Sequence, residues 1–241
     1  MRILLTNDDG TGAPGLEAME TALAASWEVY VVAPAAHCSG SGHALGLYRD
    51  ISVTSTGERS WSVGGTPADC VKLAIRELLG FLPDLAVSGI NPGPNLANNV
   101  HYSGTVAAAS EAAFWGIPAI AVSSGSPSPS HLGCAAEYVA GLIRSGVHAC
   151  IPSDSVLNLN IPDEPSCMLG PPVWTRTGRF SQDAPFIVLE PGRSYRYGRC
   201  HELPLREEAG TDVEALKAGF VSATLLGLDR SLPGFVIPQG G

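Results

Sequence analysis

The first residues that could do chemistry are two adjacent carboxylates that follow a short apolar run. Residues 2–6 have a strand-like character, and Asp8 and Asp9 come just after them, before Gly10. In an open α/β sheet, ligands bind at the carboxyl ends of the strands, so both side chains would face a site. Adjacent ionised carboxylates repel each other, and a bound cation or a raised pKa relieves the repulsion. The pair therefore predicts a metal site, with a plain turn as the alternative.

Two further oxygen donors follow other predicted strands. Ser39 lies in a Gly-rich stretch after the second predicted strand, and Asn91 comes directly after a later apolar strand. Strand–helix–strand units bring the carboxyl ends of parallel strands to one edge of the sheet. Carboxylate, hydroxyl and amide oxygens without His or Cys suit Mg²⁺ or Mn²⁺ better than zinc. We therefore expect Ser39 and Asn91 to join Asp8 and Asp9 around one ion.

An anion site is predicted next to these residues. Ser103, Gly104 and Thr105 precede an Ala-rich run that reads as a helix over residues 106–115. Such a helix start offers backbone amides, two hydroxyl groups and the positive end of the helix dipole. An ordinary N-cap has the same pattern, and the two interpretations are compatible. A hard divalent ion beside an anion site predicts metal-assisted hydrolysis of a phosphate ester.

The elements that must position these residues alternate between strand and helix over the first two thirds of the chain. This pattern predicts a Rossmann-like three-layer αβα sandwich with a mostly parallel sheet, which we assign to a catalytic core at residues 1–165. Proline, glycine and aromatic residues become frequent after residue 165. We expect residues 166–241 to form a hairpin-rich extension used in oligomerisation, whose last strand, at 220–226, returns to the core.

Composition limits the partners. The 241 residues carry a net charge of −9, whereas a nucleic-acid polymer is held by clustered Lys and Arg. We therefore expect no nucleic-acid polymer as a partner. The chain has no apolar run of membrane-spanning length and no recognisable signal peptide, so we also expect no membrane partner and a cytoplasmic location.

Taken together, these motifs resemble the SurE (survival protein E) family of metal-dependent 5′/3′-nucleotidases. The matching stretches are 7–10, Ser39 with its Gly-rich turn, 65–71, 88–95, 102–106, 210–212 and 219–224. The resemblance implies hydrolysis of nucleoside 5′- and 3′-monophosphates, in some members also of short polyphosphate. It also implies one Mg²⁺ or Mn²⁺ per subunit and a homodimer or homotetramer.

The resemblance also assigns roles by position. The implied metal ligands are Asp8, Asp9, Ser39 and Asn91, and we expect Asp8 and Asp9 to be catalytic as well. The implied contacts to the substrate phosphate are Ser103, Gly104 and Thr105, with which we group Asn95. His43 and His101 are left unassigned between a general acid and a structural role.

Two other classes of protein stay open at this point. Gly10, Gly12 and Gly15 match the spacing of a dinucleotide-binding oxidoreductase, although the preceding carboxylates would repel a pyrophosphate. A non-catalytic, Mg²⁺-binding receiver-like signalling domain also gathers acidic residues after its first strand. That class needs a further Asp at a later strand end, where this chain has Asn91 and Ser123.

Overall fold

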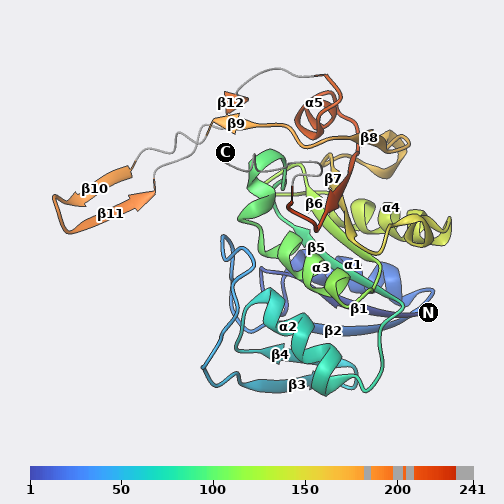
Figure 1. The fold of residues 1–241 in the computed structure, drawn as a ribbon. Coiled ribbons are helices and arrows are strands. Elements are labelled where there is room, and N and C mark those ends of the chain that lie inside the picture. The colour runs from blue at the N-terminus through green and yellow to red at the C-terminus, as the bar shows by residue number, and fades with distance from the viewer. Residues whose placement is uncertain (182–185, 198–202, 205–208, 232–241) are drawn as a thin grey trace, which may run out of the picture.

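The computed structural model describes residues 1–181, 186–197, 203–204 and 209–231. Within these residues, nine strands form one sheet in the order β3-β4-β2-β1-β5-β6-β7-β13-β8 (Figure 1). The strands are β1 Arg2–Thr6, β2 Glu28–Pro34, β3 Val53–Gly57, β4 Ser60–Val63, β5 Leu85–Asn91, β6 Ala119–Ser124, β7 Ser155–Ile161, β8 Val173–Thr175 and β13 Ser222–Gly227. The six strands from β4 to β7 in this order are parallel, while β3 and β13 pair antiparallel with β4 and β7. The predicted α/β class with a mostly parallel sheet is confirmed.

Helices cover both faces of this sheet. On one face α1 Pro14–Ala24 packs beside α4 Leu132–Arg144. On the other, α2 Pro67–Leu73, which continues into a π-helical turn at Ala74–Leu78, packs beside α3 Gly104–Phe114. The shorter helices are the 3₁₀ turns Ala97–His101, Val147–Cys150 and Ser166–Met168, and α5 Asp212–Lys217. None of the helices in the described part of the chain is long and apolar enough to cross a membrane.

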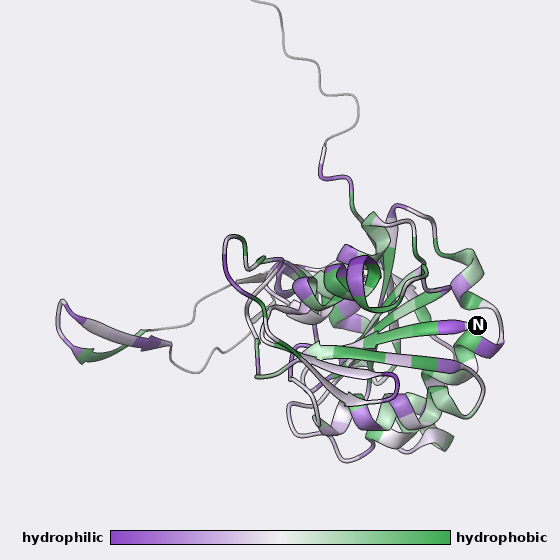
Figure 2. Cartoon of the chain, turned by 90° about the horizontal axis from the view of Figure 1, so that it is seen from below, coloured by the Kyte–Doolittle hydropathy of each residue, from purple (hydrophilic) through white to green (hydrophobic). Residues whose placement is uncertain are grey.

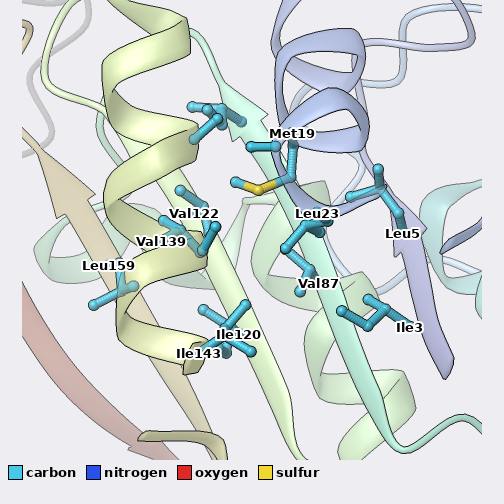
Figure 3. Close-up of a cluster of buried hydrophobic side chains, with 14 of the residues drawn as sticks. Ile3, Leu5, Met19, Leu23, Val87, Ile120, Val122, Val139, Ile143 and Leu159 are labelled. Atoms are coloured by element: carbon cyan, nitrogen blue, oxygen red, sulfur yellow. The ribbon is translucent and has the colours of Figure 1, made fainter. Parts of the chain in front are cut away.

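The two apolar cores follow from the alternation of side chains along the strands. Ile3 and Leu5 of β1 point into the layer formed with α1 and α4, where Val139 and Leu159 also lie (Figure 3). Leu4, between them in the sequence, points into the opposite layer. Successive side chains of a strand face opposite sides of the sheet, so a strand covered by helices on both faces is apolar throughout.

The order of the strands places a ligand crevice at β1. The chain passes from β1 through α1 to β2 on one side, and returns through α2 to β5 on the other side of β1. The strand order therefore reverses between β1 and β5, and open α/β sheets bind ligands beyond the carboxyl ends of the strands at such a point. Asp8 and Asp9 follow β1, and Asn91 ends β5, so the fold brings these residues to the carboxyl ends of two neighbouring parallel strands.

The chain after residue 165 adds strands to the sheet and also forms separate hairpins. Strand β13 lies between β7 and β8 in the main sheet. A small sheet pairs β9 Phe180–Ser181 with β12 Leu203–Pro204, and β10 Phe186–Glu190 pairs with β11 Ser194–Tyr197. The β10–β11 hairpin lies apart from the αβα body in both ribbon views (Figures 1 and 2). The predicted extension also includes 182–185, 198–202, 205–208 and 232–241, which lie outside the described residues.

Candidate metal and phosphate site

The turn after β1 is made by Asn7, which leaves both following carboxylates available to the crevice. The side-chain amide of Asn7 donates to the carbonyl of Gly10 at 3.1 Å, and its side-chain oxygen accepts from the Gly10 amide at 3.2 Å. Gly10 has a φ of +104°, which favours glycine. The sequence left a plain turn as the alternative to a metal site. In the structure the side chain of Asn7 makes the turn with Gly10, so the turn does not use the carboxylates of Asp8 and Asp9.

Asp8 is held against the start of α3. It is 3% exposed, and the Thr105 hydroxyl donates to its Oδ1 at 2.6 Å. A Cβ on Gly104 would lie 2.7 Å from the Cβ of Asp8, closer than such atoms approach each other, so only glycine permits this packing. The backbone carbonyl of Asp8 accepts from the Cys38 amide at 2.7 Å. The end of β1, the loop after β2 and the start of α3 therefore meet at Asp8.

Asp9 has an unpaired buried oxygen beside this contact. Its Oδ1 lies 3.3 Å from Nδ1 of His37, whereas its Oδ2 is buried and has no hydrogen-bond partner among the described residues. Burial and the charge of Asp8 raise the pKa of Asp9 to about 6, and His37 offsets this only in part. A buried carboxylate oxygen without a donor is costly, and a cation would remove that cost. The Asp8–Asp9 pair therefore fits a divalent ion.

Ser39 and Asn91 lie at the same edge of the sheet. Ser39 is exposed and follows Cys38, whose amide is bonded to Asp8. The Asn91 side-chain amide donates to the Gly93 carbonyl at 2.6 Å, so its Oδ1 is the atom that could face a cation. No group of three or more His, Cys, Asp or Glu residues in the described chain forms a metal cluster. A site that combines two carboxylates with hydroxyl and amide oxygens is compatible with that finding, and it suits hard cations.

The start of α3 has the geometry of both an N-cap and an anion site. The Ser103 hydroxyl accepts from the Val106 amide at 3.1 Å and so caps the helix. Since Thr105 is bonded to Asp8, the hydroxyls of both residues already have protein partners. The first amides of a helix have no partner within it. Since the Val106 amide is used by the cap, the amides of Gly104 and Thr105 are the groups of this turn that could bind a phosphate oxygen.

Asn95 lies in a buried polar network next to this site. Its side-chain amide donates to Ser123 Oγ at 2.8 Å, and its backbone amide donates to Oδ1 of Asn160, also at 2.8 Å. The Asn158 side chain donates to its carbonyl at 2.9 Å. These bonds anchor the loop after β5 on β6 and β7. The contact of Asn95 with a substrate stays a prediction.

Two residues that contact candidate site residues, His37 and Glu111, were not predicted from the sequence. His37 was not singled out, although its position in the loop after β2 was the available signal. Glu111 was also missed, although it is the one charged residue of the Ala-rich helix α3. Its carboxylate accepts from Lys72 Nζ at 2.7 Å and lies 3.0 Å from Nε2 of His43. The structure therefore places the half-buried His43 ring against the buried carboxylate of Glu111, whereas His101 is exposed.

The fold and this edge of the sheet define an α/β protein with a Rossmann-like topology, whose crevice suits a hard divalent cation next to an anion. The chain belongs to the survival protein SurE family, since the family model described as "Survival protein SurE" matches residues 3–184. It is 43% identical over 232 residues to the 5′-nucleotidase SurE of Geotalea daltonii, covering 95% of this chain and 94% of the relative. It is 44% identical over 232 residues to the 5′-nucleotidase SurE of Geobacter sulfurreducens, covering 95% and 88%.

A solved structure agrees with this assignment. The crystal structure of the SurE protein from Aquifex aeolicus superposes with a TM-score of 0.84 at 35% identity, covering 96% of this chain and 95% of that one. The resemblance inferred from the motifs is therefore confirmed, and the receiver-like and dinucleotide-binding alternatives are set aside.

Proposed function

We propose that this protein is a metal-dependent 5′-nucleotidase, which hydrolyses nucleoside monophosphates to nucleoside and inorganic phosphate. Membership of the SurE family supports this activity, as do the relatives named 5′-nucleotidase SurE that match 95% of the chain. The observation that carries the proposal is the buried Oδ2 of Asp9, which has no hydrogen-bond partner among the described residues. Asp9 follows Asp8, which Thr105 holds at the start of α3. Activity on 3′-monophosphates and on short polyphosphate belongs to the same proposal.

One Mg²⁺ or Mn²⁺ per subunit would be held by Asp8, Asp9, Ser39 and Asn91. When bound, such an ion neutralises charge on the phosphate and lowers the pKa of a coordinated water. The donor set supports this choice of metal, because it contains only oxygen atoms.

The protein's own groups would position the reacting atoms. Thr105 fixes the orientation of Asp8 through its 2.6 Å hydrogen bond. The amides of Gly104 and Thr105 in the first turn of α3, with the positive end of its dipole, would stabilise negative charge on the phosphate oxygens. Asp9 would accept a hydrogen bond from the attacking water and orient it toward the phosphorus. In this scheme Asp8 and Asp9 are the catalytic residues, and Ser103, Gly104 and Thr105 line the phosphate position.

The test is phosphate release from a panel of nucleoside 5′- and 3′-monophosphates and tripolyphosphate, with Mn²⁺, Mg²⁺ or a chelator. We expect release to require the metal and to fall by roughly a hundredfold or more in Asp9→Asn. Asp154→Asn is the matched control, because Asp154 is exposed at the opposite edge of the sheet. Calorimetric titration with Mn²⁺ should show weaker binding to Asp9→Asn than to the wild type, and unchanged binding to Asp154→Asn. Full activity in chelator, or in Asp9→Asn, would contradict the proposal.

We also propose that residues 1–165 form the catalytic core and that residues 166–241 form an extension through which the chain assembles into a homodimer or homotetramer. Support comes from the β10–β11 hairpin, whose side chains Phe186, Ile187, Val188 and Leu189 are all more than half exposed. An isolated two-stranded hairpin is marginally stable in water, and exposed apolar patches mark interaction sites. Light scattering on the purified protein tests the assembly. The cytoplasmic location stays a prediction.

A further inference from the structure

The loop after β2 carries Ser39, one of the proposed metal ligands, and we call its residues 35–46 the Ser39 loop. The Cys38 amide donates to the Asp8 carbonyl at 2.7 Å, and the Ser41 amide donates to the Cys38 carbonyl at 3.1 Å. These bonds join the loop to the end of β1 and form a turn around Ser39. Ser39 itself is exposed. Its position therefore also depends on how the second half of the loop is held.

The second half of the loop is held on α3. The Gly42 amide donates to the Tyr102 carbonyl at 2.9 Å, just before the helix begins. Nε2 of His43 lies 3.0 Å from Oε2 of Glu111, in the second half of the helix. The His43 ring also stacks on that of Phe114, with 5.6 Å between the ring centres and an angle of 22° between the ring planes. The loop thus contacts both the start and the body of α3.

The bond between His43 and Glu111 is of a strong kind. The Glu111 side chain is 6% exposed and that of His43 is 26% exposed, so little water competes for the contact. Burial alone would raise the pKa of Glu111, but the hydrogen bonds that it accepts from His43, Lys72 and Trp115 outweigh burial and lower the pKa to about 2. The carboxylate is therefore ionised at neutral pH and can only accept, so Nε2 of His43 is the donor. Hydrogen bonds to ionised groups are stronger than those between neutral groups.

The place of this bond on α3 indicates what His43 does. Glu111 follows Gly104 by seven residues, or roughly 10 Å along the helix axis. A general acid must lie within hydrogen-bond reach of the leaving group, whereas this nitrogen donates to a carboxylate in the body of the helix. Since Glu111 and the amides that would bind phosphate belong to one helix, the bond fixes the Ser39 loop relative to the phosphate position.

We propose that His43 is a positioning residue, which holds the Ser39 loop on α3 through Glu111 and so sets where Ser39 meets the metal ion. The proposal rests on the nucleotidase function above. A loop that is already held in place loses less conformational freedom when its ligand binds, so the bond strengthens metal binding without touching the metal. Of the two roles that the sequence left open for His43, this is the structural one.

The first test measures Mn²⁺ binding by calorimetry in three variants. His43→Phe keeps a ring against Phe114 but removes the donor to Glu111, and we expect it to weaken Mn²⁺ binding roughly tenfold. His43→Gln retains a donor and should restore most of the affinity. Lys72→Met is the matched control, because it removes another donor to Glu111 and leaves the loop's bond in place. Wild-type affinity in His43→Phe, or an equal loss in Lys72→Met, would overturn the proposal.

The second test observes the loop directly, in the metal-free protein. The amides of Cys38 and Gly42 are hydrogen-bonded at the two ends of the turn around Ser39. Their hydrogen exchange should be roughly tenfold faster in His43→Phe than in the wild type, and unchanged in Lys72→Met. Equal exchange in His43→Phe and the wild type would show that the bond does not hold the loop, and would overturn the proposal even if metal affinity changed.

The third test separates positioning from acid catalysis by phosphate release from adenosine 5′-monophosphate at increasing Mn²⁺. In His43→Phe the Mn²⁺ concentration for half-maximal activity should rise roughly tenfold, while kcat at saturating Mn²⁺ stays within about threefold of the wild type. Loss of a general acid would instead lower kcat by roughly a hundredfold or more at any metal concentration, and that result would overturn the proposal. If no ester releases phosphate with any metal, the nucleotidase function itself fails, whereas calorimetry and hydrogen exchange still decide the role of His43.

Discussion

The buried carboxylate of Glu111 offers a quantitative test of the structure through the replacement Glu111→Gln. Glu111 is 4% exposed, and its Oε1 accepts from Lys72 at 2.7 Å and from the Trp115 ring nitrogen at 3.2 Å. Its Oε2 lies 3.0 Å from Nε2 of His43. Glutamine keeps the size of the side chain, but it removes the charge and turns one acceptor into a donor that faces other donors.

The size of the effect follows from the pKa. Burial alone would raise the pKa of Glu111, but the hydrogen bonds from His43, Lys72 and Trp115 outweigh burial and lower it from 4.5 to about 2. A shift of this size corresponds to roughly 3 kcal/mol of folding stability at neutral pH. Because the folded-state pKa lies below the unfolded one, this stability is fully present above the unfolded value. It is lost as the pH falls from about 4.5 toward about 2.

The assay is urea unfolding of the metal-free protein in chelator, from about pH 7 down to about pH 3. We expect the free energy of unfolding of Glu111→Gln to be lower than that of the wild type by roughly 3 kcal/mol at neutral pH. This difference between the two proteins should become smaller as the pH falls through the acidic range. Glu20→Gln, on the exposed face of α1, is the control and should change stability by less than about 0.5 kcal/mol. A gap that stays constant with pH, or one no larger than that of the control, would refute this account of Glu111.

Three further predictions concern the crevice and the hairpin. In Gly104→Ala, the new Cβ would lie 2.7 Å from Asp8 Cβ and displace that side chain, so turnover should fall roughly tenfold or more in a folded protein; wild-type kcat would contradict this packing. Thr105→Val removes the donor to Asp8 and should weaken Mn²⁺ binding by roughly 10- to 100-fold in calorimetry, while Thr105→Ser keeps it; equal affinities would show that the hydrogen bond is dispensable. Ile187→Asp places a charge on the exposed hairpin and should shift the mass found by light scattering toward the monomer; an unchanged mass would place the subunit contact elsewhere.

Local patterns in the sequence determined most of the secondary structure. Apolar runs of strand length alternate with helical runs, and the strands and helices occur where those patterns predict them. The residues at which helices begin could also be predicted. Ser103 caps α3, as its position before the Ala-rich run predicts, and Thr66 and Asp69 form a capping box at α2. These patterns predict structure because the interactions that produce them join residues only three or four positions apart.

The edge of the sheet that carries the site could also be predicted from sequence. The carboxyl ends of parallel strands meet at one edge, so the order of strands and helices along the chain assigns Asp8, Ser39 and Asn91 to a common crevice. Their roles as ligands remain predictions, which the metal-binding experiments above test.

Only the tertiary structure decided which side chains are partners and how the space beside Asp9 is shaped. Thr105 meets Asp8 across 97 positions, and His43 meets Glu111 across 68. The cavity beside Asp9 has walls from α1, the end of β5, the loop after β6 and α4. These features depend on which strands are neighbours, on how closely Gly104 lets α3 approach β1, and on the loss of water around each group. Such long-range packing and burial leave no periodic trace in the sequence, because no local interaction energy encodes them.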